Sequence, residues 1–107
     1  MANPWAGEVA VTLNGEARVA RLTLGALAEL ETALGTGTLV ELAERFEGGR
    51  FSVRDVLLLV AAGLRGGGWG GTAADLRDAD LGGGPVAMVR VAAELLARAF
   101  TVPEAGG

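Results

Sequence analysis

Several chemically important side chains are missing from this sequence. It contains no cysteine, which excludes disulfides, thiolate metal sites and thiol nucleophiles. It contains no histidine, so it lacks the usual general base and the commonest transition-metal ligand. Tyrosine and lysine are absent too, which leaves carboxylates, hydroxyls and arginine for any catalysis. We therefore expect a protein with no cofactor and no metal, and a small enzyme is only a remote alternative.

Positive charge is also scarce. The nine basic residues are all arginine, are scattered along the chain and are outnumbered by 13 acidic ones, so the net charge is −4. Because neutralising phosphates needs a basic patch, we expect no nucleic-acid partner. The longest apolar run, Val56 to Gly63, is far too short to cross a membrane, and the first residues lack the pattern of a signal peptide. We therefore expect no membrane partner and a cytoplasmic location.

Length and hydrophobic content indicate one folded unit. The 107 residues suffice for one domain with a single core, and half of them are hydrophobic. We predict an α+β fold, mostly α, in which an N-terminal β-hairpin over residues 8–22 precedes a bundle of four to five short helices. The single domain spans residues 1–107, and residues 1–6 and 101–107 are expected to be loose.

A leucine pattern defines the first predicted helix, residues 24–34. Four leucines recur at spacings of three, three and four, which places on one helix face Leu24, Leu27, Leu30 and Leu34. Thr23 is suited to cap the start of this helix, and Gly35 to take the left-handed position after its end. We expect this leucine face to cover the apolar side of the hairpin.

Further helices are predicted at about residues 39–47, 53–64, 73–79 and 85–100. Thr38 and Glu41 have the spacing of a capping box, and Ser52 and Asp55 repeat that spacing. The helix over residues 53–64 is apolar around most of its circumference, which is typical of a central helix or of one half covered by a partner. Its expected inward side chains are Val56, Leu57, Val60 and Leu64, with Leu59 near one edge. The last helix should present two adjoining apolar faces, made of Met88, Val89, Val91, Ala92, Ala93, Leu95, Leu96 and Ala99.

The hairpin surrounds the pair Asn14-Gly15, a frequent turn sequence. A two-residue loop would pair Leu13 with Glu16 and would turn Val19 away from the valines of the first strand. A three-residue loop that includes Leu13 would set the valines of both strands on one face. Because a slip by one residue turns apolar side chains to water, we predict the three-residue loop, with Gly15 in a left-handed bulge.

The stretch over residues 66–84 is rich in glycine. Gly66, Gly68 and Gly71 match the spacing of a dinucleotide-binding loop, G-x-G-x-x-G. Such a loop follows a β-strand in a unit with two parallel strands, whereas the segment before Gly66 is predicted to be a helix. We therefore interpret residues 66–71 as a flexible linker and not as a nucleotide site.

Leu58 and Trp69 are the candidate partner-binding residues. Leu58 lies well away from the expected inner face of its helix, and Trp69 stands between glycines. Two interpretations remain open. In the first, the last helix covers Leu58, and Trp69 drops into a groove of its own domain. In the second, the two side chains form an exposed apolar patch of the kind that marks a protein interface.

An ordered set of short segments resembles one known family. The segments are RLTLGALAELETALG at 21–35, LAERF at 42–46, SVRDV at 52–56 and AAGLRG at 61–66, preceded by the hairpin segment GEVAVTLNG. They are similar to the small tail proteins of gene transfer agents, the phage-like particles that package host DNA. The resemblance covers residues 7–66 well and the remainder only in outline.

This resemblance implies a part in building the tail, and it implies no catalytic residues. The implied partners are other tail proteins, either the tail tube or the tape measure, and self-association of the chain stays open. The leading hypothesis is a factor similar to phage tail assembly chaperones, which binds other tail proteins during assembly. The alternative is a structural component associated with the tail tube and incorporated into the particle. A tail tube subunit is ordinarily a β-rich ring former, so the predicted helices favour the assembly role.

Overall fold

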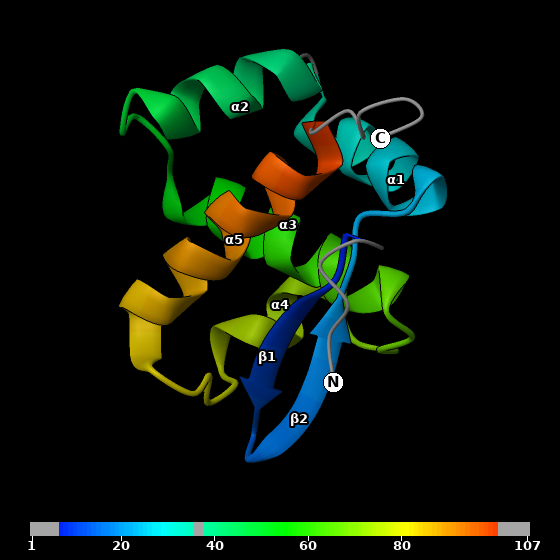
Figure 1. Cartoon of the computed structure of the whole chain (residues 1–107), viewed down its shortest axis with the longest axis vertical. Helices are drawn as coiled ribbons and strands as arrows, with labels where there is room; N and C mark the ends of the chain where they lie inside the picture. Colours follow the sequence, from blue (N-terminus) through cyan, green and yellow to red (C-terminus); the bar gives the residue numbers. More distant parts are fainter. Residues whose placement is uncertain (1–6, 36–37, 101–107) are drawn as a thin grey trace, which may run out of the picture.

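The computed structural model describes residues 7–35 and 38–100. In these ranges, a hairpin of two antiparallel strands is followed by five helices (Figure 1). The elements are β1 (Val9–Leu13), β2 (Glu16–Ala20), α1 (Leu24–Leu34), α2 (Leu39–Glu47), α3 (Val53–Gly66), α4 (Ala73–Arg77) and α5 (Gly84–Phe100). The predicted fold class is therefore confirmed. Residues 1–6 and 101–107, which we expected to be loose, lie outside the described residues.

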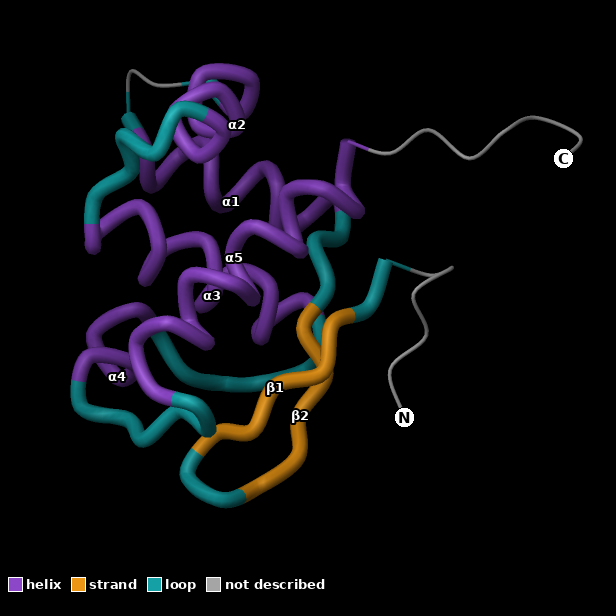
Figure 2. Tube along the Cα trace, turned by 60° about the vertical axis from the view of Figure 1, so that its left-hand side comes forward, coloured by secondary structure: helices purple, strands orange, loops and turns teal. Residues whose placement is uncertain are grey.

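Helix α3 is the centre of the molecule. It packs against α1, α4, α5 and β2, and Figure 2 shows α3 and α5 between α2 at one end and the hairpin at the other. Its buried apolar side chains are Val56, Leu59, Val60, Ala61, Ala62 and Leu64. Leu59, which we expected near an edge, is fully buried, whereas Leu57, expected inside, is only half-buried. Val56, Val60 and Leu64 are buried as expected. The inner face is thus wider than predicted and is shifted towards Leu59, because neighbours surround this helix on several sides.

The hairpin has a two-residue loop, so the predicted three-residue loop is wrong. Leu13 pairs with Glu16, and the two loop residues Asn14 and Gly15 have positive φ angles of 52° and 80°. Turns of this kind match the twist of the strands. Contacts from a distant segment also hold the turn: the Asn14 amide donates to the Asp80 carbonyl at 2.7 Å, and the Asp80 amide donates to the Asn14 side-chain oxygen at 2.9 Å.

The observed register leaves Val19 on the face opposite Val9 and Val11, yet Val19 is still half-buried. Gly67, just past the end of α3, lies against the Val19 carbonyl, where there is no room even for a Cβ atom. The chain after α3 thus packs beside β2 at Val19, whereas Ala17, on the same face of β2, is exposed.

The outer helices are also rotated relative to the predicted faces. On α1, Leu24 is 86% exposed, and the fully buried positions are Ala26 and Leu30. On α5, Leu95 is buried against Gly63 of α3, while Ala93, expected on an inner face, is exposed. In both helices, close contact with α3 decides which side chains face inward, and leucine spacing alone does not show that contact.

Candidate functional site

Leu58 and Trp69, the candidate partner-binding residues, are both partly buried and packed against the core. Leu58 lies on α3. Trp69 follows that helix, its amide donates to the Leu64 carbonyl at 2.9 Å, and its ring leaves no room for a side chain at Gly71. Each residue therefore has one side against its own domain and one side open to solvent. Binding of a partner by Leu58 and Trp69 stays a prediction.

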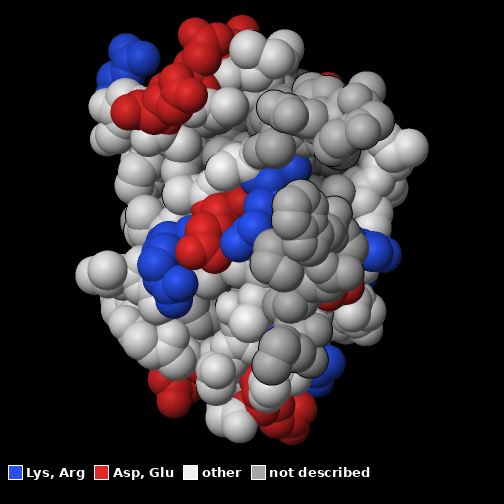
Figure 3. All heavy atoms as spheres, viewed as in Figure 1, with Lys and Arg blue, Asp and Glu red and all other residues white. Residues whose placement is uncertain are grey.

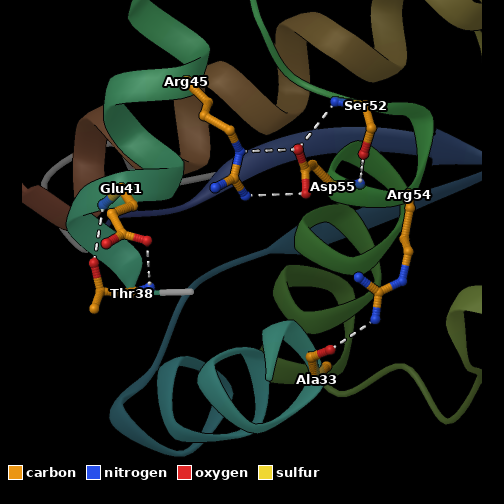
Figure 4. A network of polar contacts seen from close by, with 7 residues as sticks. All are labelled: Ala33, Thr38, Glu41, Arg45, Ser52, Arg54 and Asp55. Carbon is orange, nitrogen blue, oxygen red and sulfur yellow. Dashed lines mark hydrogen bonds and ion pairs between the residues drawn. The ribbon is translucent and has the colours of Figure 1, made fainter. Parts of the chain in front are cut away.

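A polar junction holds α2 against the start of α3 (Figure 4). The Arg45 guanidinium donates from Nε to Oδ2 of Asp55 at 3.3 Å and from Nη2 to Oδ1 at 3.2 Å. Asp55 also accepts from the Ser52 amide at 2.9 Å, while the Ser52 hydroxyl accepts from the Asp55 amide at 3.0 Å. One carboxylate therefore completes the capping box of α3 and binds α2 at the same time.

Asp55 is the buried charged residue of the described chain, with 7% of its surface exposed. Burial by itself raises the pKa of this carboxyl. The hydrogen bond from the Ser52 amide and the adjacent Arg45 guanidinium outweigh burial and hold the pKa of Asp55 below its usual value. The side chain is therefore a stabilised carboxylate. A general acid or base would instead need a pKa near the working pH.

Two more arginines bind other elements together. The Arg54 guanidinium donates to the Ala33 carbonyl in the last turn of α1 at 2.9 Å (Figure 4), and Arg65 of α3 forms an ion pair with Glu29 of α1. Carbonyls at the end of a helix lack partners within it, so a cation there is favourable. These arginines thus have evident structural roles.

A hollow beside α2 is lined by Glu41, Glu44, Arg45 and Arg50. Glu41 is engaged in the capping box of α2, where the Thr38 hydroxyl accepts from the Glu41 amide at 3.1 Å. Figure 3 shows acidic and basic groups close together at the end of the molecule where α2 lies. The lining thus mixes both charges, and two of its members, Glu41 and Arg45, already have structural partners.

The described residues do not form the nucleotide or metal sites that were considered from the sequence. The segment before the glycine-rich stretch is helical, so the strand that a dinucleotide loop requires is missing there. Asp75 accepts from the Thr72 amide at 2.9 Å as the capping residue of α4. Within residues 7–35 and 38–100, no group of three or more metal-ligating side chains comes together. None of the helices in these ranges combines the length and the hydrophobicity that a membrane span requires.

Exposed apolar side chains form a second set of surface candidates, which the sequence reasoning missed. They are Leu24 at 86%, Val40 at 60%, Val53 at 77% and Val86 at 81% exposed. All four lie in the first turn of a helix. For Leu24, Val40 and Val53 the available signal was a predicted N-cap one or two residues before them, because a side chain there can extend past the neighbouring helices.

Comparison with protein families identifies the chain. The family model described as phage tail tube protein, GTA-gp10, matches residues 6–102, and the chain belongs to this family. No curated protein matches it, and no solved structure does. The structure and the family together define a mostly helical tail protein of the gene transfer agent type.

Proposed function

We propose that this protein is a structural component of the tail, associated with the tail tube and retained in the finished particle. The observation that carries the proposal is the family match over residues 6–102, whose description names the tail tube. The proposal replaces the assembly chaperone as the leading hypothesis. The mostly helical fold by itself favours the assembly role, but the family description names the tail tube, and we give that description the greater weight.

The hairpin affects how such a subunit can assemble. On the outer edge of β1, the Gly82 amide donates to the Thr12 carbonyl at 2.9 Å. On the outer edge of β2, the Arg21 amide donates to the Gly63 carbonyl at 2.8 Å. A ring built by joining sheet edges needs free edges, and here the chain's own segments occupy part of each edge. We therefore place the contacts to other tail proteins on side-chain surfaces.

Leu58 and Trp69 are our proposed contact to another tail protein. Half-buried aromatic and aliphatic side chains are held rigidly by their own domain, so ordering them on binding costs little entropy. Tryptophan is also enriched among the residues that dominate interface energies. The pair therefore suits a partner with an apolar surface, such as a tube subunit.

Mass spectrometry of purified particles tests the proposed function directly. A structural component should be present at a fixed, high copy number relative to the major tail proteins. If the protein is abundant in producing cells but absent from particles, the proposal is wrong and the assembly factor is correct.

The contact is tested with the double variant L58S/W69S, followed by thermal melting and by particle yield. Since each side chain has an open side, we expect a large loss of complete tails while the melting temperature changes only moderately. The matched control is Leu24→Ser, which removes a leucine that is 86% exposed and should leave yield unchanged. Collapse of stability together with assembly would show that the pair belongs to the core.

A further inference from the structure

The outer face of α5 is unusually apolar for a helix surface open to solvent. Val86, Ala93 and Ala97 are all exposed, Val86 to 81%. At 3.6 residues per turn, these three positions fall within about 40° of one another. They form a seam along most of the 17-residue helix, which we call the α5 seam. Sustained spacing of this kind is typical of a helix that packs against another helix.

The two flanks of the α5 seam differ in charge. Arg90 and Glu94 lie on one flank, about 40° and 80° around the helix from Val86. Val89, half-buried, lies on the other flank. The Arg90 and Glu94 side chains form an ion pair at 3.4 Å and remain 64% and 35% exposed. Figure 3 shows basic and acidic groups side by side over the region where α5 crosses the front of the molecule in Figure 1.

Other exposed apolar residues do not form such a surface. On α1 only Leu24 and Ala28, one turn apart, are exposed on one face, and Val40 and Val53 lie singly near the starts of α2 and α3. Along α5 the exposed apolar positions extend over about three turns of one face, beside an exposed pair of opposite charges.

We propose that the α5 seam binds the α5 seam of a second copy of this chain, with the two helices antiparallel. In an antiparallel pair related by two-fold symmetry, like flanks face each other. Arg90 of one copy then meets Glu94 of the other, and the same ion pair forms a second time by symmetry. A parallel pair would place the charged flank of one copy against the Val89 flank of the other. The charges would then lack opposite charges across the contact, and Val89 would lack an apolar partner. Charges beside a helix seam determine partner and orientation in this way.

Small side chains at the centre of the seam suit this arrangement. Ala93 lies close to the two-fold axis that brings Arg90 opposite Glu94, so the helices can approach to the short end of the usual range, about 8 Å. The proposal rests on the geometry and charges of α5 and not on the tail function. Association of the isolated chain therefore tests it separately from the presence of the protein in particles.

The experiment measures the mass of the full chain by analytical ultracentrifugation over a range of concentrations. We expect a reversible shift from 10.8 kDa towards twice that mass as concentration rises. The variant R90E puts two acidic side chains at positions 90 and 94, and E94R puts two basic ones there. Each variant alone should remain monomeric, because like charges then face each other across the axis. An equimolar mixture should form a heterodimer.

Two valines supply a matched control. Val86→Arg should abolish association, whereas Val53→Arg, at an equally exposed first-turn position on α3, should leave it unchanged. Circular dichroism should show all variants folded, since the substituted side chains face solvent. A wild-type chain that stays monomeric at every concentration overturns the proposal, as does an R90E chain that dimerises like the wild type. Failure of the two charge variants to pair when mixed would rule out the antiparallel arrangement.

Discussion

Replacing Asp55 with asparagine tests the junction between α2 and α3. The substitution keeps the shape of the side chain and an oxygen that can accept from the Ser52 amide. It removes the negative charge that pairs with Arg45 over two hydrogen bonds, at 3.3 and 3.2 Å. It therefore separates the charge of Asp55 from its size.

The expected loss of stability is moderate. The side chain of Asp55 is 9% exposed and that of Arg45 is 32% exposed, so the pair is screened less than a surface pair. Charge-assisted hydrogen bonds and a weakened N-terminal cap together are worth about 1.5 kcal/mol. With an unfolding entropy of about 2.1 cal/mol/K per residue, the melting temperature should fall by about 7 °C.

Asp75→Asn is the matched control. Asp75 occupies the same capping-box position on α4, is exposed, and accepts from the Thr72 amide at 2.9 Å. Its loss should cost about 0.5 kcal/mol, the low end of the range for a cap. Chemical denaturation of both variants gives the two free energies. If Asp55→Asn costs no more than Asp75→Asn, the contact with Arg45 contributes nothing and our reasoning is refuted.

The pH dependence gives a second check on Asp55. Its folded-state pKa is lower than the usual value of 3.8, so the wild type gains stability from this group above that pH. The gain is lost as the pH falls from about 3.8 through the lower folded-state pKa, because the carboxyl becomes protonated. The difference in unfolding free energy between wild type and Asp55→Asn should be full at pH 7 and shrink in acid. A difference that is constant across this range would contradict the cause that we assign.

Two further predictions concern close packing and the turn. Gly66→Ala should lower the melting temperature although alanine favours helices, because a Cβ atom there would collide with the Arg21 carbonyl; Gly70→Ala, where space is open, should leave it unchanged. Asn14→Gly should cost less stability than Asn14→Ala in denaturant unfolding, because glycine tolerates the positive φ and loses only the side-chain bond to Asp80. Equal melting of the Gly66 and Gly70 variants, or equal costs at Asn14, would contradict these reasons.

Local signals predicted the elements of this fold well. Thr38 with Glu41 and Ser52 with Asp55 form the capping boxes that their spacing indicates. Such boxes involve residues three apart, so the physics that makes them is contained in a few adjacent positions. The same holds for the fold class, because a hairpin followed by helices follows from turn residues and hydrophobic period.

Contacts between residues far apart in the sequence determined features that the hydrophobic pattern could not predict. Bonds between Asn14 and Asp80, which are 66 positions apart, hold the two-residue turn in place. Burial of Leu59 and exposure of Leu24 depend on which elements surround each helix. The spacing of the leucines does not change when a helix rotates about its axis, so the spacing alone cannot show which face is buried.

The candidate binding surfaces also differ in whether the sequence alone could predict them. Helical spacing singled out Leu58, and the flanking glycines singled out Trp69. The α5 seam could not be predicted from the sequence, because alanine and valine are common in protein cores and were expected to be buried. The packing of α5 on α3, for example of Leu95 on Gly63, determines which apolar side of α5 stays in solvent. The physical reason is that a helix buries only the part of its surface that neighbouring elements contact.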